Sequence, residues 1–237
     1  MCHDFILMLM ITLKPPFTAI WPHKVGDACL RVAGTDAATF LQAQLTCDAL
    51  NMPLHTTTLG AWCNAQGRVR AVLRITRFDN HFDCVLPASL LEHTQKTLSR
   101  YVMRSQVTIT AVSCDGPSLA PAAFIAAGIP EITPDTAEQF VPQMLNLDQL
   151  GGVSFTKGCY PGQEIVARLH FKGGLKRRLA VFKVADAKPN VNDGVFSGSD
   201  LVGQVLDVAD GVLSAVVQLT HVHETLTLAD GAPLLPH

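Results

Sequence analysis

The chain has 237 residues, of which 48% are hydrophobic and only 16% are charged, so it can bury a sizeable core and is not expected to be disordered. Its formal net charge of −2 argues against a protein that binds nucleic acid mainly through phosphate contacts, but it still allows a local basic patch. The seven cysteines are odd in number and include no CxxC pair. They disfavour a disulfide framework or a zinc knuckle and favour the reduced cysteines of a cytoplasmic protein.

Near the N-terminus, residues 5–13 form an apolar run of nine residues. Such a run is far shorter than the roughly 20 residues that span a bilayer, and it has neither a basic leader nor a small-residue cleavage site. We interpret it as a buried strand or an extension from an upstream start codon, with a degenerate signal peptide as the weaker alternative. The sequence therefore predicts no membrane association.

The first 112 residues show alternating strand and helix patterns. We expect a helix over 36–45, capped by Thr35 or Asp36, and a second helix from Pro87 to about residue 101. The inward side chains of the second helix should be Leu90, Leu91 and Leu98. The expected strands cover residues 57–63, 68–77, 82–86 and 107–112, and a hairpin turn at 64–67 joins the first two. This order favours an α+β fold with an antiparallel sheet, and we take residues 1–112 as the N-terminal domain.

The rest of the chain has a different pattern. The segment 113–146 is rich in proline and contains one short helix, 121–127, which Gly128 should end. After residues 173–174, both glycines, short strands about ten residues apart are expected at 179–184, 201–208, 213–219 and 226–228. Such spacing without helices is typical of a small antiparallel barrel. We therefore expect a middle region over 113–172 and a C-terminal β-barrel over 173–237.

The segment 151–168, GGVSFTKGCYPGQEIVAR, carries the strongest chemical signal. Pro161 suits the first position of a helix, which would place Cys159 just before a helix N-terminus. The free backbone N–H groups there and the charge of Lys157 would both favour the thiolate, which is the reactive form of cysteine. Cys159 is thus the candidate reactive residue, although a cysteine next to glycine can also be a space-filling residue. Because no histidine base is evident, a Cys–His hydrolase has no support.

This segment, and above all KGCYPGQE at 157–164, resembles the signature of the YgfZ family, whose members are similar in fold to the glycine-cleavage aminomethyltransferase, the T-protein. Three further segments resemble the same family: VAGTDAATFLQAQLTCD at 32–48, GAWCNAQGRVR at 60–70 and FVPQMLNL at 140–147. Together they extend the resemblance over most of residues 25–180.

The resemblance implies antiparallel α/β folate-binding domains around a central channel that accepts tetrahydrofolate. It also implies a role in maturing, maintaining or repairing iron–sulfur enzymes, including some that modify tRNA, with Cys159 and Lys157 as the functional pair. The folate channel would be lined by Tyr160, Gln163, Glu164, Arg168 and Trp62. The two aromatic rings suit stacking on a pterin, although Trp62 alternates with apolar residues in a strand and fits a core position better.

Two departures from the family pattern bear on function. The stretch between the strand ending near Val112 and the segment 124–129 is short, so much of the middle domain of longer members is missing. Ala126 stands where folate-binding relatives often have a glutamate. Aminomethyl transfer is therefore disfavoured and folate affinity is expected to be weak or altered. A folate-dependent one-carbon transferase is the alternative function.

A basic stretch follows the signature and comprises Arg168, His170, Lys172, Lys176, Arg177 and Arg178. It could hold a folate polyglutamate tail or an RNA backbone, or be a solvated linker, and the near-neutral net charge disfavours direct RNA binding. His221 and His223 would share one face of a strand. With no third ligand apparent, no metal site is predicted.

Overall fold

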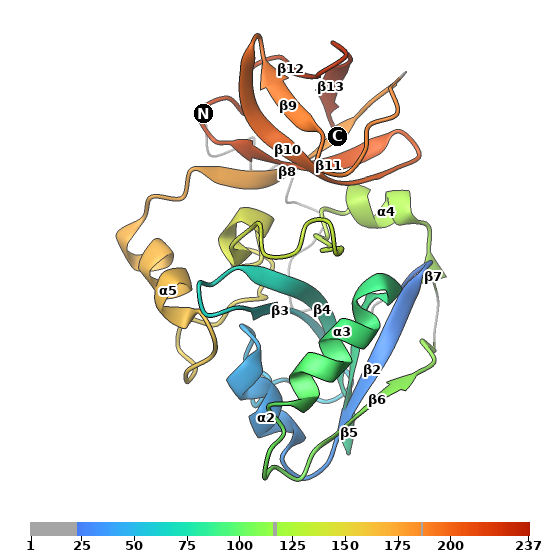
Figure 1. Cartoon of the computed structure of the whole chain (residues 1–237), viewed down its shortest axis with the longest axis vertical. Coiled ribbons are helices and arrows are strands. Elements are labelled where there is room, and N and C mark those ends of the chain that lie inside the picture. The colour runs from blue at the N-terminus through green and yellow to red at the C-terminus, as the bar shows by residue number, and fades with distance from the viewer. Residues whose placement is uncertain (1–22, 116–117, 186) are drawn as a thin grey trace. The chain divides into compact units, whose positions relative to one another are not determined.

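The structure is a computed structural model and describes residues 23–115, 118–185 and 187–237. The apolar run predicted at 5–13 lies outside them. The described chain forms two compact units (Figure 1). The α/β unit takes its residues from 23–119 and 131–175, and the barrel unit takes its residues from 120–130 and 176–237. The middle region expected over 113–172 thus contributes residues to both units.

A five-stranded antiparallel sheet is the frame of the α/β unit. Its order is β3–β4–β5–β2–β6, and its strands are β2 (Asp27–Ala33), β3 (Thr57–Cys63), β4 (Val69–Arg77), β5 (His81–Pro87) and β6 (Thr108–Val112). A short parallel pair, β1 (His23–Lys24) and β7 (Ser118–Leu119), belongs to the same unit. The unit also contains α2 (Ala37–Gln44) and α3 (Ala88–Ser99), and α3 packs against β2, β5 and β6 (Figure 1). The α+β prediction for this part of the chain is confirmed.

The turn between β3 and β4 has the form that its sequence predicts. Asn64 Oδ1 accepts hydrogen bonds from the backbone N–H groups of Gln66 (3.0 Å) and Arg68 (2.9 Å). Gly67 adopts a φ of +71°. An asparagine that bonds the following backbone and a glycine with positive φ are both suited to a tight hairpin turn. Because these requirements are local, the sequence was sufficient to predict the turn.

Two details of the helices differ from the prediction. Asp36 is the N-cap residue of α2, but its side chain makes no cap bond, because its Oδ2 accepts the backbone N–H of Gln106 at 2.7 Å. In α3 the predicted inward residue Leu91 is half-buried. The buried residues of α3 are Leu90, Thr94 and Leu98. This spacing of four residues keeps one narrow helix face against the sheet and leaves Leu91 at its edge.

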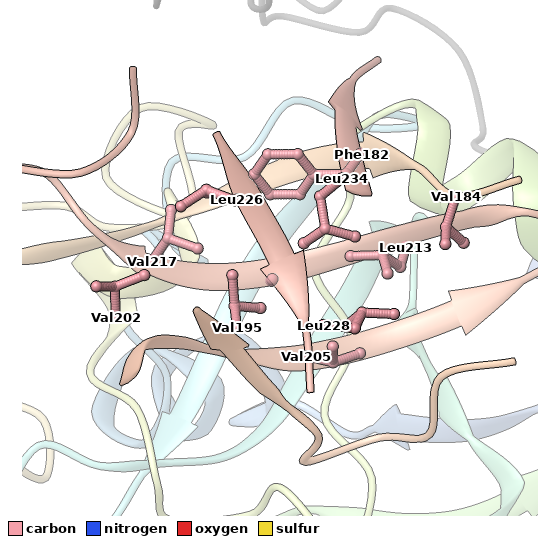
Figure 2. Close-up of a cluster of buried hydrophobic side chains, with 11 residues drawn as sticks. Phe182, Val184, Val195, Val202, Val205, Leu213, Val217, Leu226, Leu228 and Leu234 are labelled. Carbon is pink, nitrogen blue, oxygen red and sulfur yellow. The ribbon is translucent and has the colours of Figure 1, made fainter. Parts of the chain in front are cut away.

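The barrel unit contains a closed antiparallel barrel with the strand order β10–β11–β8–β13–β12–β9. The strands are β8 (Arg177–Lys183), β9 (Gly194–Ser197), β10 (Asp200–Ala209), β11 (Val212–Gln218), β12 (Leu226–Leu228) and β13 (Pro233–Pro236). Buried apolar side chains, among them Phe182, Val195 and Leu213, fill its interior (Figure 2). The predicted barrel is confirmed. β9 and β13 were not predicted, because four residues that include glycine or proline are too short a pattern.

The short helix α4 (Pro121–Ala126) also belongs to the barrel unit and contacts β10 and β11. It ends just before Gly128, whose φ is +68°, as its sequence predicts. Among the helices of the described residues, none combines the length and the apolar character that crossing a membrane requires.

Candidate functional site

The signature segment forms a loop, residues 155–162, which we call the signature loop, followed by helix α5 (Gln163–Lys172) of the α/β unit. The prediction that Pro161 opens this helix is wrong. Gly162 is the N-cap residue and has a φ of +79°, a left-handed conformation that cannot belong to a right-handed helix. Pro161 therefore lies before the helix. Cys159 lies three residues before the N-cap, not directly beside the helix N-terminus.

Gly162 packs against the backbone of the β3–β4 turn. A Cβ atom at this position would lie 2.4 Å from Gly67 Cα and 2.5 Å from the carbonyl oxygen of Asn64, distances that real Cβ atoms essentially never show. Glycine is thus needed here both for its positive φ and for the close approach of two backbones. The contact fixes one end of the signature loop to a turn that also carries the family resemblance.

Lys157 fixes the loop near its other end. Its ammonium group donates hydrogen bonds to the backbone carbonyls of Gln42, Leu45 (2.5 Å) and Cys47 (3.1 Å). These carbonyls lie in the last turn of α2 and just beyond it, where a cation is favoured by the helix dipole. Burial lowers the pKa of Lys157, and the nearby carboxylate of Asp48 opposes this effect. The hydrogen bonds thus place the ammonium group of Lys157 at the C-terminal end of α2. That Lys157 acts together with Cys159 stays a prediction.

Cys159 lies between these two anchors and is exposed. The other cysteines in the described residues are buried or half-buried: Cys29, Cys47, Cys63, Cys84 and Cys114. Burial raises the pKa of Cys47 and Cys63 to about 12, so these thiols stay protonated and unreactive near neutral pH. Within the described chain, a reagent or a partner protein from solution therefore has easiest access to Cys159.

The two aromatic residues predicted for the folate channel are buried. Trp62 is 1% exposed in β3, and Arg70 Cζ lies 5.1 Å from its ring centroid. Tyr160 is 6% exposed, its ring centroid lies 4.9 Å from Lys157 Nζ, and burial raises its pKa. Neither ring presents a free face, so the two residues do not fit the pterin-stacking role. Trp62 instead occupies the core position that its apolar neighbours indicated.

The other three predicted channel residues lie on α5, where Gln163 is half-buried and Glu164 and Arg168 are exposed. Arg168 lines a groove of about 480 Å³ between α5, the β3–β4 turn and the short helix η1 (Pro142–Leu145). Its basic lining residues are Arg68, Arg168 and Lys172. Its apolar lining residues are Val141, Met144, Ile165 and Leu169. The sequence prediction included two of the three cations. It missed Arg68, because Arg68 is distant in sequence and reaches the groove through the fold.

The predicted basic stretch is divided between the two units. Arg168 and Lys172 lie on α5 of the α/β unit, whereas residues 176–178 belong to the barrel unit. His170 stacks on Phe155 with the ring centroids 3.7 Å apart. The stretch is therefore not one continuous helix or strand, and only its first part can be assigned to the groove.

The histidine pair is not where the prediction placed it. His221 and His223 lie in the turn that follows β11, because the strand ends at Gln218 and the N–H of His221 bonds back to the carbonyl of that residue. No cluster of three metal-ligating side chains is found in the described residues. Ala126 lies at the end of α4, in the barrel unit.

A buried ionic cluster, which the sequence did not reveal, joins β1, β2 and β4. Arg74 pairs with Asp27 and with Glu131 (3.4 Å), and Lys24 also pairs with Glu131. All four side chains are at most 14% exposed. Burial raises the pKa of Asp27, and the charge of Arg74 acts against this effect. Since both carboxylates face cations inside the unit, we interpret the cluster as structural.

Comparison with known proteins gives relatives but no match to a family model. An uncharacterized protein of Haemophilus influenzae is 30% identical over 196 residues, which cover 65% of this chain and 70% of the relative. The tRNA-modifying protein YgfZ of Klebsiella pneumoniae is 29% identical, with 64% of this chain and 68% of the relative covered. The protein of the same name from Photobacterium profundum is 26% identical, with 80% of both chains covered.

Among solved structures, the fold is similar to that of the glycine cleavage system aminomethyltransferase T from Bartonella henselae. The TM-score is 0.73, and the match covers 90% of this chain and 83% of that chain. The sequence identity is only 13%, so this likeness shows a shared T-protein-like fold and nothing about shared activity.

Proposed function

The chain belongs to the YgfZ family, and from this membership we propose that it is an accessory factor that matures, maintains or repairs iron–sulfur enzymes, including enzymes that modify tRNA. In this proposal Cys159 is the reactive group and tetrahydrofolate is a ligand. The relatives named as tRNA-modifying proteins support the link to tRNA, and the folate ligand is what the resemblance to the family implies.

The observation that carries the proposal is the position of Cys159. A thiol that acts on another protein must be reachable from solution and must be held in a defined place. Cys159 is exposed, and the loop that bears it is anchored by the ammonium group of Lys157 and by the backbone contact of Gly162. We therefore assign Lys157 a positioning role in the proposed site.

The test is a cysteine replacement in cells that lack the wild-type protein. Cys159→Ser should lower the content of nucleosides that iron–sulfur enzymes introduce into tRNA, measured by mass spectrometry of digested tRNA. The matched control is Cys114→Ser, because Cys114 is a half-buried cysteine of the same unit. An immunoblot must show equal amounts of both variants. If Cys159→Ser cells keep the nucleoside content of Cys114→Ser cells, the proposed role of the thiol is wrong.

The folate part of the proposal needs a separate test. The exposed Arg168 suits the carboxylates of a folate, but the buried Trp62 and Tyr160 do not suit its ring, so we assign no ring contact to them. Calorimetric titration with tetrahydrofolate and with its 5-formyl derivative should show saturable binding. If neither ligand releases or absorbs heat at any protein concentration that can be reached, the chain has no folate site of useful affinity and a thiol-based role remains.

A further inference from the structure

One face of α5 lines the groove described above. Ile165, Arg168, Leu169 and Lys172 have the spacing i, i+3, i+4 and i+7, which places them on a single helix face. Val141 and Met144, at and within η1, also line the groove, and so does Arg68 of the β3–β4 turn. All of these residues belong to the α/β unit.

The lining combines apolar side chains with positive charge and contains no carboxylate. Arg68 is held in place, since its Nη1 donates a hydrogen bond to the carbonyl of Gln139 at 2.7 Å. Ile165 is 36% exposed, which is a large fraction for an isoleucine on a helix that packs against its own protein. An exposed apolar surface with a charged rim is typical of a binding site, and its charge selects the opposite charge on the partner.

The groove suits a protein segment better than a nucleic acid. Single-stranded nucleic acids are bound by aromatic side chains on which bases stack, and none of the groove's lining residues is aromatic. The aromatic side chains of this region, Phe155, His170 and Phe171, contact one another instead of lining the groove. A groove with apolar lining side chains is, in contrast, a common docking site for an amphipathic peptide segment.

We propose that this groove docks an acidic amphipathic segment of a partner protein, whose apolar side chains would contact Met144 and Ile165 and whose carboxylates would pair with the three groove cations. The groove volume of about 480 Å³ is in the range that accommodates a few side chains, so the segment is short.

The groove lies close to the exposed thiol along the chain. Ile165 is only six positions after Cys159 in the chain, so their Cα atoms are at most about 20 Å apart. A partner seated in the groove would therefore have its bound segment near Cys159. The importance of this nearness to Cys159 rests on the function proposed above, whereas the docking of the segment in the groove does not.

The experiment follows the methyl groups of Met144 and Ile165 by NMR in the full chain during titration with synthetic peptides. The acidic probe is a twelve-residue peptide with leucine at i, i+3, i+4 and i+7 and glutamate at the other positions. We expect it to shift both methyl signals and to saturate. A matched peptide with lysine in place of glutamate should shift neither. Combined replacement Arg168→Glu and Lys172→Glu should weaken the acidic peptide roughly tenfold or more, because two attractive charge pairs become repulsive.

The control for the charge change is Lys96→Glu, an exposed lysine on α3 of the same unit, which should leave the affinity unchanged. The proposal is overturned if the acidic peptide shifts neither methyl group, or if the double replacement does not weaken its binding. It is also overturned if a uridine oligonucleotide or tetrahydrofolate, and not the peptide, shifts these signals. The first of those two outcomes would assign the groove to RNA, and the second would assign it to the folate of the proposed function.

Discussion

Replacing Gly162 with alanine tests the contact that anchors the signature loop. The residue has a φ of +79°, and a left-handed backbone costs an alanine about 1–2 kcal/mol. The added Cβ would also lie 2.4 Å from Gly67 Cα, where ordinary contact begins at 3.4 Å. Because Gly67 Cα is a backbone atom, it cannot move aside as the end of a flexible side chain would. We therefore expect this close contact to cost about 1–3 kcal/mol more. The total is about 2–5 kcal/mol, a large part of the stability of an ordinary domain.

Two other glycines separate these contributions. Gly158 is in the same loop, its φ is not positive and a Cβ there meets nothing within 4 Å, so Gly158→Ala should leave stability within about 0.5 kcal/mol or raise it slightly. Gly174 has a φ of +96° but no close neighbour, so Gly174→Ala should show the backbone strain alone, about 1–2 kcal/mol.

The assay is urea unfolding followed by tryptophan fluorescence in a Trp21→Phe background, so that the buried Trp62 of the α/β unit reports the transition. With an m-value of about 2 kcal/mol per molar urea, Gly162→Ala should lower the midpoint by roughly 1–2.5 M. If Gly162→Ala and Gly158→Ala unfold at the same urea concentration, the loop is not packed on the β3–β4 turn and the inferred anchor is wrong.

Three further predictions concern buried polar groups, and urea unfolding measures each. Lys157→Met removes the donor from three backbone carbonyls and should lower the free energy of unfolding by about 2–4 kcal/mol. Lys157→Arg should be less harmful, because it keeps the positive charge. If Lys157→Met loses no stability, the anchoring role of Lys157 is wrong. Arg74→Met leaves two buried carboxylates without their shared cation and should cost about 3–5 kcal/mol of stability. The control Arg31→Met breaks an ion pair in which the arginine is 37% exposed and should cost less than about 1 kcal/mol. Equal costs for the two variants would contradict the structure. Burial raises the pKa of Cys63 from 9.0 to about 12, so between these pH values the folded protein keeps a proton that the unfolded chain releases. The stability that the protonated, buried thiol contributes to the folded state is therefore fully present below about pH 9 and is lost as the pH rises toward 12. Cys63→Ala should therefore reduce the loss of stability between pH 8 and pH 10 by about 1.4 kcal/mol, and an unchanged pH dependence would show that the thiol is not buried.

Local patterns were enough to predict most of the secondary structure. The strands β3 and β4, the turn at 64–67 that joins them and the end of α4 just before Gly128 all depend on residues close to one another in the chain. The barrel was predicted from four of its strands, although β9 and β13 were not. The signature that identifies the family is likewise a continuous stretch, and so the sequence also singled out Cys159.

The roles of the residues around Cys159 were decided by the tertiary structure. Lys157 donates hydrogen bonds to carbonyls 110 to 115 positions away in the chain, so its contact with the end of α2 could not be predicted from neighbouring residues. The start of α5 was predicted two residues too early, because the conformation of Gly162 depends on its close packing against the backbone of Gly67, which is far from it in sequence. Arg68 enters the groove, and Arg74 enters the ionic cluster, for the same reason. Periodicity and turn residues encode interactions within a few residues along the chain, whereas these contacts exist only once distant segments have been packed together.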